Sequence, residues 1–239
     1  MSAELSERME DIARRIRAAC DRAGRDPDTV RLLPVSKTVS PDGVAEAAAC
    51  GLTVFGENRV QEARQKIPLC PSHLKWHLVG HLQTNKVREA VRLFEMIHAV
   101  DSMRLLEFVD RIAQEEGRSM PVCLEVNVSG ERSKFGMAPE EVPAALARSS
   151  TLFRVQIMGV MTIPPVSKDP EEARGYFRRL RELRDRWRQE SGLPLEELSM
   201  GMSHDFEVAV EEGATWVRLG TLLFGARKKP VAEERHEDG

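Results

Sequence analysis

The chain alternates short apolar runs with longer amphipathic stretches, and this alternation repeats eight times between residues 31 and 225. The apolar runs are Arg31–Ser36, Thr53–Phe55, Leu74–Val79, Met96–Ala99, Pro121–Val128, Val155–Thr162, Leu195–Ser199 and Thr215–Leu219. The helical patterns that follow them cover Pro41–Cys50, Arg59–Lys66, Thr84–Phe94, Ser102–Glu116, Pro139–Ser149, Pro170–Glu190, Asp205–Glu212 and Thr221–Gly225. Because each run is too apolar to leave one face in water, the pattern predicts a parallel sheet covered by helices.

Eight strand–helix units are the number that closes a (β/α)8 barrel. The second and seventh runs are the weakest strand signals, so an open doubly wound sheet stays as the alternative. Ahead of the first run, apolar residues from Leu5 to Ala23 recur at helical spacing until Gly24 and Pro27 interrupt them. We therefore expect the α/β class, with a single (β/α)8 TIM barrel and an extra N-terminal helix.

Composition bounds the domain count and the partners. No internal repeat, linker or composition break divides the chain, so we expect one domain over residues 1–227 and a charged, solvated tail over residues 228–239. The 35 basic and 38 acidic side chains nearly cancel, and this balance predicts no global attraction to nucleic acid or anionic lipid. Four cysteines without a C-x-x-C pair, a charged N-terminal segment and no long apolar run predict a cytoplasmic location and no membrane span.

In a barrel, functional side chains follow the C-terminal ends of the strands. That rule selects Lys37, Gly56-Glu57-Asn58, Gly80-His81, Ser129-Gly130 with Lys134, Met161-Thr162, Ser199–Ser203, and Arg218 with Gly220-Thr221. The segments Ser199–Ser203 and Leu219–Thr221 place glycine and hydroxyl residues where a strand gives way to a helix, and free backbone N–H groups there favour an anion. Ordinary turns and helix caps have the same composition, so only the two segments together indicate a phosphate site.

Lys37 ends an apolar run, where limited water favours the neutral amine, a nucleophile that can form a Schiff base. A lysine whose stem merely lies along apolar surface is the alternative. A nucleophilic lysine with a phosphate cradle across the barrel mouth suggests pyridoxal phosphate.

Several motifs along residues 30–227 resemble, in consistent order, those of the pyridoxal phosphate homeostasis protein family, the YggS/PROSC group. They are Pro34-Val35-Ser36-Lys37-Thr38, Phe55-Gly56-Glu57-Asn58, the run from Trp76 to Lys86, Val126-Asn127-Val128-Ser129-Gly130 with Ser133-Lys134, Gly159 to Pro165, Leu198–Ser203, and Val217-Arg218-Leu219-Gly220-Thr221 to Arg227. Because the resemblance extends over most of the chain, it is far more specific than any single motif.

The resemblance implies the fold of type III pyridoxal phosphate proteins, a barrel like the N-terminal domain of alanine racemase, with the cofactor on the Lys37 amine. It implies that Ser203, Gly220 and Thr221 hold the phosphate and that Arg218 approaches the pyridine nitrogen. Asn58, His81 and Met161 would line the pocket. The chain departs mildly from the family pattern at Thr84, at His204 and at Phe135, which follows Lys134 where a small residue is usual.

Two further hypotheses compete with the cofactor carrier that the resemblance implies. A racemase or decarboxylase-type enzyme is the first, but related racemases use a tyrosine as second acid/base, and the single tyrosine here, Tyr176, lies in a helix away from the predicted mouth. A barrel that binds another phosphate ester is the second. The resemblance favours a non-catalytic monomer that acts in intracellular vitamin B6 homeostasis and delivers pyridoxal 5′-phosphate to apo-enzymes.

Two patterns imitate other sites. His73, His77 and His81 have helical metal-site spacing, but in a strand four residues span ~13 Å, too far for one ion, so we expect no metal. Seven arginines lie between Arg174 and Arg188, yet an apolar stripe opposes them, as on a solvated barrel helix that binds no nucleic acid.

Overall fold

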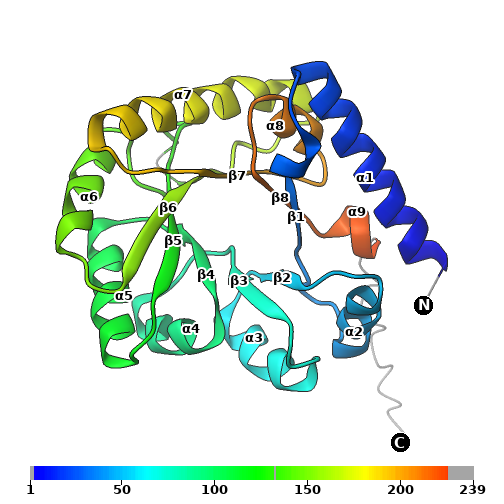
Figure 1. Ribbon diagram of the computed structural model, residues 1–239, viewed down its shortest axis with the longest axis horizontal. Coiled ribbons are helices and arrows are strands. Elements are labelled where there is room, and N and C mark those ends of the chain that lie inside the picture. Colours follow the sequence, from blue (N-terminus) through cyan, green and yellow to red (C-terminus); the bar gives the residue numbers. More distant parts are fainter. Residues whose placement is uncertain (1–2, 132, 226–239) are drawn as a thin grey trace, which may run out of the picture.

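The computed structural model describes residues 3–131 and 133–225, which form eight parallel strands in a ring with helices outside it (Figure 1). The strands are β1 (Arg31–Pro34), β2 (Val54–Glu57), β3 (Lys75–Leu78), β4 (Met96–Val100), β5 (Met120–Glu125), β6 (Val155–Met161), β7 (Glu197–Met202) and β8 (Trp216–Leu219). The α-helices are α1 (Ala3–Ala23), α2 (Pro41–Ala49), α3 (Val60–Lys66), α4 (Val87–Leu93), α5 (Met103–Glu115), α6 (Val142–Arg148), α7 (Arg174–Ser191), α8 (Phe206–Glu211) and α9 (Thr221–Phe224). The expected charged tail, residues 228–239, lies outside the described residues.

The ring closes at both sides of β1. The sheet order runs β1-β8-β7-β6-β5-β4-β3-β2, and a bridge between Val35 and Gly56 joins its two ends. There the Ser36 N–H donates to the carbonyl oxygen of Gly56 at 2.9 Å. The barrel prediction is therefore confirmed, and the open sheet kept as an alternative is wrong.

Local capping explains where several helices begin and end. The Ser40 hydroxyl accepts from the Gly43 N–H ahead of α2, and the Ser102 hydroxyl accepts from the Leu105 N–H ahead of α5. Each bond satisfies a backbone donor that the first helical turn leaves unpaired. Gly192, with φ of 69°, ends α7 in the left-handed region that favours glycine.

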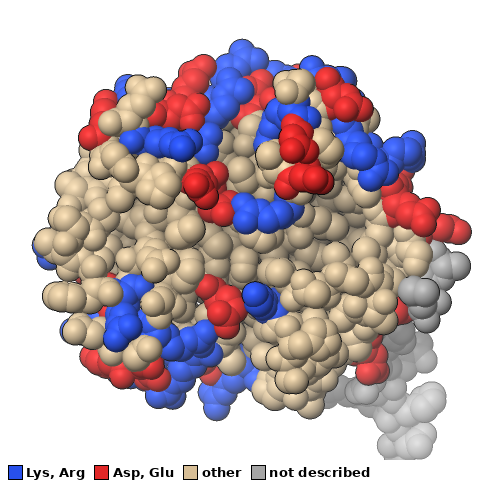
Figure 2. Space-filling model, viewed as in Figure 1, with Lys and Arg blue, Asp and Glu red and all other residues tan. Residues whose placement is uncertain are grey.

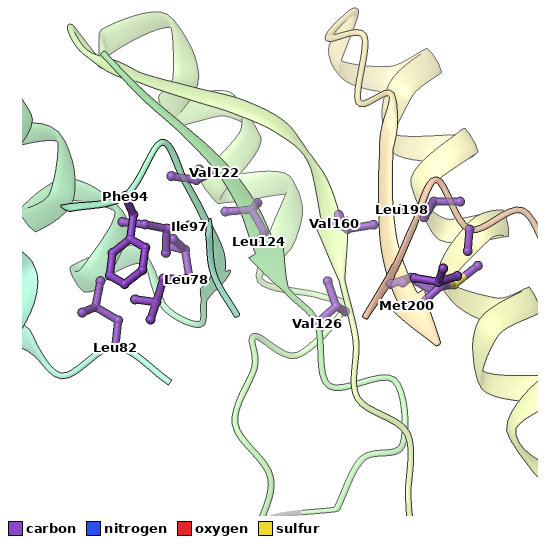
Figure 3. Close-up of a cluster of buried hydrophobic side chains, with 14 of the residues drawn as sticks. Leu78, Leu82, Phe94, Ile97, Val122, Leu124, Val126, Val160, Leu198 and Met200 are labelled. Atoms are coloured by element: carbon purple, nitrogen blue, oxygen red, sulfur yellow. The ribbon is translucent and has the colours of Figure 1, made fainter. Parts of the chain in front are cut away.

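The apolar core has two layers because strand side chains alternate between the two faces of the sheet. The outer layer lies between strands and helices and includes Leu78, Ile97, Val122, Leu124, Val160, Leu198 and Met200 (Figure 3). Inside the ring, one cluster contains Leu33, Val35, Val79 and Trp216, and another contains Met96, Ala99, Cys123 and Met161. The interior is thus filled with side chains, as in other (β/α)8 barrels.

The expected N-terminal helix packs outside the barrel. α1 lies against α8 and α9 at the side of the ring (Figure 1). Its buried face includes Ile12 and Ile16, and Arg15 Nη2 lies 2.8 Å from Glu207 Oε2 on α8. α1 therefore covers apolar surface that the last strand–helix units would otherwise leave in water.

The arginine-rich stretch forms α7, whose side chains serve packing within the chain. Phe177 and Trp187 are buried against the barrel. On the other side, Arg174, Arg178 and Arg181 reach Glu212, the residue directly after α8, at 3.0–3.2 Å. Along the upper edge of Figure 2, where α7 lies in Figure 1, basic and acidic side chains are interspersed. This helix presents a mixed surface rather than a basic stripe.

The three histidines spaced four residues apart lie in different surroundings. His73 is exposed ahead of β3, His77 lies within that strand, and His81 follows it, so the three do not face one ion. Over residues 3–131 and 133–225, no group of three His, Cys, Asp or Glu side chains is placed to hold a metal. Among the helices of the same residues, none is long and apolar enough to cross a membrane.

One strand boundary was predicted wrongly in a way that matters for the site. The sequence placed the end of the seventh strand at Ser199, but β7 continues to Met202. Serine and glycine indicate a turn, yet pairing of Met202 with Arg218 of β8 extends the strand. Ser199 is consequently buried inside the ring, and only Ser203 follows the strand end.

The close approach of β6 and β7 can be tested at Gly159. A Cβ atom there would overlap the Glu197 carbonyl oxygen, which is backbone and cannot swing away. We expect Gly159→Ala to lower the free energy of unfolding by about 3 kcal/mol, the upper range for overpacking. Gly175→Ala is the control, because open space surrounds that position and alanine favours a helix.

Urea denaturation followed by tryptophan fluorescence measures both variants. We expect Gly175→Ala to leave stability unchanged or slightly raised. Equal effects at the two glycines would show that β6 and β7 are farther apart than the structure indicates.

Candidate functional site

The eight residues expected to form the site lie at or near the C-terminal ends of the strands, as the barrel rule requires. They are Lys37, Asn58, His81, Met161, Ser203, Arg218, Gly220 and Thr221. Lys37 is half-buried in the turn after β1, which ends at Pro34, two residues before the end of the predicted run Arg31–Ser36. Asn58 follows β2 directly, and Met161 is the last, fully buried residue of β6.

The backbone on both sides of Lys37 is held by two side chains of α3. Lys66 Nζ donates to the carbonyl oxygen of Ser36 at 2.7 Å. On the other side, the Thr38 N–H donates to Glu62 Oε1 at 2.6 Å. Thr38 has φ of 66°, an uncommon conformation for a β-branched residue, and the Glu62 bond helps to keep it there. Lys37 therefore projects from a restrained turn.

Lys66 is itself the centre of a buried ionic cluster beneath that turn. Its Nζ lies 2.7 Å from Glu57 Oε1 and 2.8 Å from Glu62 Oε1. Glu57 is fully buried, and this burial raises the pKa of its carboxyl, while hydrogen bonds from Lys66 and Ser36 act in the opposite direction. Sequence reasoning selected Glu57 but missed Lys66 and Glu62, although their i,i+4 spacing on one helix was a usable signal.

The two segments expected to hold a phosphate come together. The Leu222 N–H, in the first turn of α9, donates to the Ser203 hydroxyl at 3.3 Å. A Cβ at Gly220 would come within 3.1 Å of the Val35 carbonyl oxygen, so a larger residue would crowd this corner. The expectation that this cradle lies across the mouth from Lys37 is wrong. β8 pairs with β1 in a closed barrel, and the cradle is next to the strand that carries Lys37.

Arg218 lies inside the ring, 4% exposed, and donates only to neutral acceptors. Its Nη1 donates to the Ser199 hydroxyl at 2.9 Å, and its Nη2 donates to the Thr162 carbonyl oxygen at 3.0 Å. Among the described residues no carboxylate is within ion-pair distance of it. Burial lowers the pKa of Arg218 to about 10, and the more distant charges of Asp205 and Glu125 partly offset this effect. Its charge is thus available to an acceptor in the mouth.

A chain of hydrogen bonds continues from Arg218 through the barrel interior. His98 Nδ1 lies 2.8 Å from the Ser199 hydroxyl, and His98 Nε2 lies 3.0 Å from His77 Nδ1. Burial lowers the pKa of His77 to about 4 and that of His98 well below its usual value, so both rings are neutral. Since a guanidinium only donates, the Ser199 hydroxyl hydrogen is free to donate to His98. These hydrogen bonds therefore hold the Arg218 guanidinium in one orientation.

Two acidic residues of the mouth were missed because the sequence list included nothing from the fourth strand and passed over the fifth strand's last residue. Asp101 follows β4, and its Oδ2 lies 2.9 Å from His81 Nδ1. Glu125 is the last residue of β5. The rule that selected Lys37 and Asn58 applies equally to these strand ends.

Phe135, where the sequence differs from the family pattern, contacts His81. Its ring stacks on His81 with centroids 3.9 Å apart, although Phe135 remains 57% exposed. The neighbouring Lys134 places Nζ 3.5 Å from the Ile163 carbonyl oxygen. The loop after β5 therefore contacts the β3 end through an aromatic stack.

Comparisons with known proteins agree with this geometry. The family model described as alanine racemase, N-terminal domain, matches residues 8–228. The pyridoxal phosphate homeostasis protein of Aquifex aeolicus is 48% identical over 223 residues, which are 93% of this chain and 98% of that protein. PipY of Synechococcus elongatus, solved with PLP bound, is 42% identical with a TM-score of 0.81, covering 92% of this chain and 100% of that one.

A more distant structure supports the fold alone. Alanine racemase from Corynebacterium glutamicum is 18% identical with a TM-score of 0.64, and the match covers 95% of this chain but 64% of the racemase. The racemase therefore has substantial structure beyond the shared barrel.

Removing the Lys66 charge tests the cluster beneath Lys37. Lys66→Met leaves Glu57 buried without its cation, and breaking a buried pair in this way should cost about 3–5 kcal/mol of unfolding free energy. Because the charged carboxylate is the unstable form, the deficit should shrink as pH falls and Glu57 is protonated.

Arg64→Met is the matched control on the same helix, since Arg64 forms an exposed pair with Glu89 that is worth less than about 1 kcal/mol. Chemical denaturation at neutral and acid pH measures both. Equally small losses, independent of pH, would contradict a holding role for Lys66.

Proposed function

Because the chain belongs to the family of the alanine racemase N-terminal domain and, within it, to the pyridoxal phosphate homeostasis proteins, we propose that it binds pyridoxal 5′-phosphate in the barrel mouth and acts in the homeostasis of that cofactor. One observation of the structure supports this most strongly. The restrained turn with Lys37 follows β1, and β1 pairs with β8, the strand that leads into the corner formed by Ser203, Gly220 and Thr221. An amine and an anion cradle side by side suit a phosphorylated aldehyde.

The residues present fit this cofactor. Lys37 supplies the amine that holds the cofactor aldehyde as a Schiff base. Ser203, Gly220 and Thr221 hold the phosphate at the corner where β8 ends and α9 begins. Asn58, His81 and Met161, from the ends of β2, β3 and β6, line the remaining pocket.

Arg218 bears on whether the bound cofactor is used for catalysis. Pyridoxal phosphate supplies a reversible Schiff base and, when its ring nitrogen is protonated, a sink for electrons. Arg218 can only donate hydrogen bonds, so beside that nitrogen it stabilises the unprotonated ring. The hydrogen-bond chain through Ser199 and His98 keeps the guanidinium in place. This arrangement favours retention of the cofactor over carbanion chemistry.

We therefore propose a non-catalytic carrier that delivers the cofactor to pyridoxal-phosphate-dependent apo-enzymes. Tyr176 cannot serve as the second acid/base of a racemase from its place on α7, where it packs against the outer core. The four free thiols are consistent with the proposed cytoplasmic location. We further propose that the protein is a monomer. A racemase or decarboxylase is the alternative that the tests below must exclude.

The first test concerns Lys37. With pyridoxal phosphate present, the protein should show the near-visible absorbance of a Schiff base and, after borohydride reduction, a covalent adduct on the peptide containing residue 37. Lys37→Ala should abolish both signals, because the phosphate cradle alone forms no covalent bond. Lys75→Ala is the control, since Lys75 is exposed at the opposite end of the barrel, at the start of β3.

An adduct that persists on the same region in Lys37→Ala would remove Lys37 from this role. A colourless protein that binds other phosphate esters would instead favour the third sequence hypothesis.

The second test separates carrier from enzyme. The loaded protein should restore activity to a pyridoxal-phosphate-dependent apo-enzyme, because a reversible imine and one phosphate site permit release. It should not racemise common amino acids measurably, whereas an enzyme typically reaches roughly 1–10³ turnovers per second. Robust turnover that requires Lys37 would revive the enzyme alternative, and absence of both transfer and turnover would contradict delivery.

A further inference from the structure

Glu125 occupies a distinctive place in the barrel mouth. Along β5, Val122 and Leu124 point to the outer core in Figure 3, whereas Cys123 belongs to an interior cluster. Glu125 comes two residues after Cys123 in the same strand, so its side chain points to the same face, the barrel interior. In the eight-stranded ring β5 is four strands from β1 in either direction, which places Glu125 across the mouth from Lys37.

Glu125 also differs from the other buried carboxylates of the described residues. Asp110 accepts from the N–H groups of Phe153, Arg154 and Val155. Glu57, Glu197, Asp205 and Glu212 likewise each accept at least one hydrogen bond.

Glu125 is only 6% exposed, and within residues 3–131 and 133–225 its carboxyl has no hydrogen-bond or ion-pair partner. The fully enclosed side-chain atoms that lack a partner among the described residues are Glu57 Oε2 and Trp216 Nε1, so the Glu125 carboxyl still reaches the solvent of the mouth. A group bound in the mouth can therefore form the hydrogen bond that the protein leaves unmade.

Two charged side chains influence Glu125. Asp101 approaches from the end of β4 and Arg218 from β8, while His81 contacts Asp101. Burial, and then the Asp101 charge, raise the pKa of Glu125 to about 7, and Arg218 acts in the opposite direction. The carboxyl therefore changes charge near neutral pH.

We propose that Glu125 is a ligand-contact group whose protonated carboxyl donates a hydrogen bond to the anionic cofactor, so that cofactor binding is coupled to proton uptake. This inference rests on the proposed function, because it takes pyridoxal phosphate as the ligand. A carboxylate at this position would repel the negative ligand, whereas the neutral acid supplies the donor that the ligand's oxygens need.

The sign of the pH dependence follows from linkage. An anionic ligand raises the pKa of Glu125 in the complex above its value in the free protein. Affinity should then be constant below about pH 7 and fall above it, by at most tenfold per pH unit for one proton.

The probe is pyridoxine 5′-phosphate, which has the same ring and phosphate but no aldehyde, so that reaction with Lys37 plays no part. Titration calorimetry on the full-length protein measures the dissociation constant of this probe from about pH 6 to about pH 8.5. This range extends to both sides of the Glu125 pKa of about 7. Wild type, Glu125→Gln and Glu115→Gln are compared. Glu115 is a control because it pairs with Arg88 on the outer surface of α5.

Glu125→Gln keeps a donor and cannot ionise. We expect it to bind like wild type near pH 6 and to lose the decline above neutrality, apart from the phosphate titration that all three proteins share. Glu115→Gln should follow wild type. Repeating the wild-type titration in two buffers of different ionisation enthalpy counts protons directly, and uptake of a fraction of a proton is expected slightly above pH 7.

Parallel pH profiles for wild type and Glu125→Gln would overturn the inference while leaving the proposed function standing. Absence of proton uptake by wild type would overturn it even if the variant did not fold. Failure of wild type to bind either pyridoxine 5′-phosphate or pyridoxal phosphate would instead contradict the proposed function itself.

Discussion

The hydrogen bonds that the two residues after β1 form to both neighbouring strands determine where every part of the site lies. The Val35 N–H donates to the Leu219 carbonyl oxygen at 2.8 Å on one side, and the Ser36 N–H donates to the Gly56 carbonyl oxygen on the other. Closure brings the last strand beside the first, so the cradle at Gly220 is next to the Lys37 turn. It also leaves β5 as the strand facing Lys37, which is why Glu125 lies opposite the amine.

Two buried polar networks support the site from different layers of the barrel. The Lys66 cluster lies between sheet and helix and restrains the turn that carries Lys37. The chain of His77, His98 and Ser199 lies inside the ring and holds Arg218. Buried polar groups are costly unless satisfied. The Lys66 network satisfies Glu57 Oε1 and the Ser36 carbonyl oxygen but leaves Glu57 Oε2 without a partner, whereas His98 and Ser199 are linked to each other and to Arg218.

Under the proposed function, Lys37 would form a reversible covalent link and the corner at Ser203 would hold an anion. Arg218 is a buried hydrogen-bond donor inside the ring. The groups nearest to acid–base function are Glu125 and the His81–Asp101 pair. Under the proposed function, a carboxyl with a pKa of about 7 suits both retention and release of a negatively charged cofactor.

The sequence by itself determined the eight strand–helix units, the N-terminal helix and the residues that recur in the family, because apolar periodicity and short motifs are local properties. Lys37, Ser203 and Arg218 were selected this way. Only the tertiary structure decided that the corner at Gly220 is beside the Lys37 turn, that Ser199 is interior, that Lys66 holds this turn, and that Glu125 ends the strand opposite β1. These facts depend on which strands pair around a closed ring and on which face of each strand is buried, and both are set by packing between segments far apart in the chain.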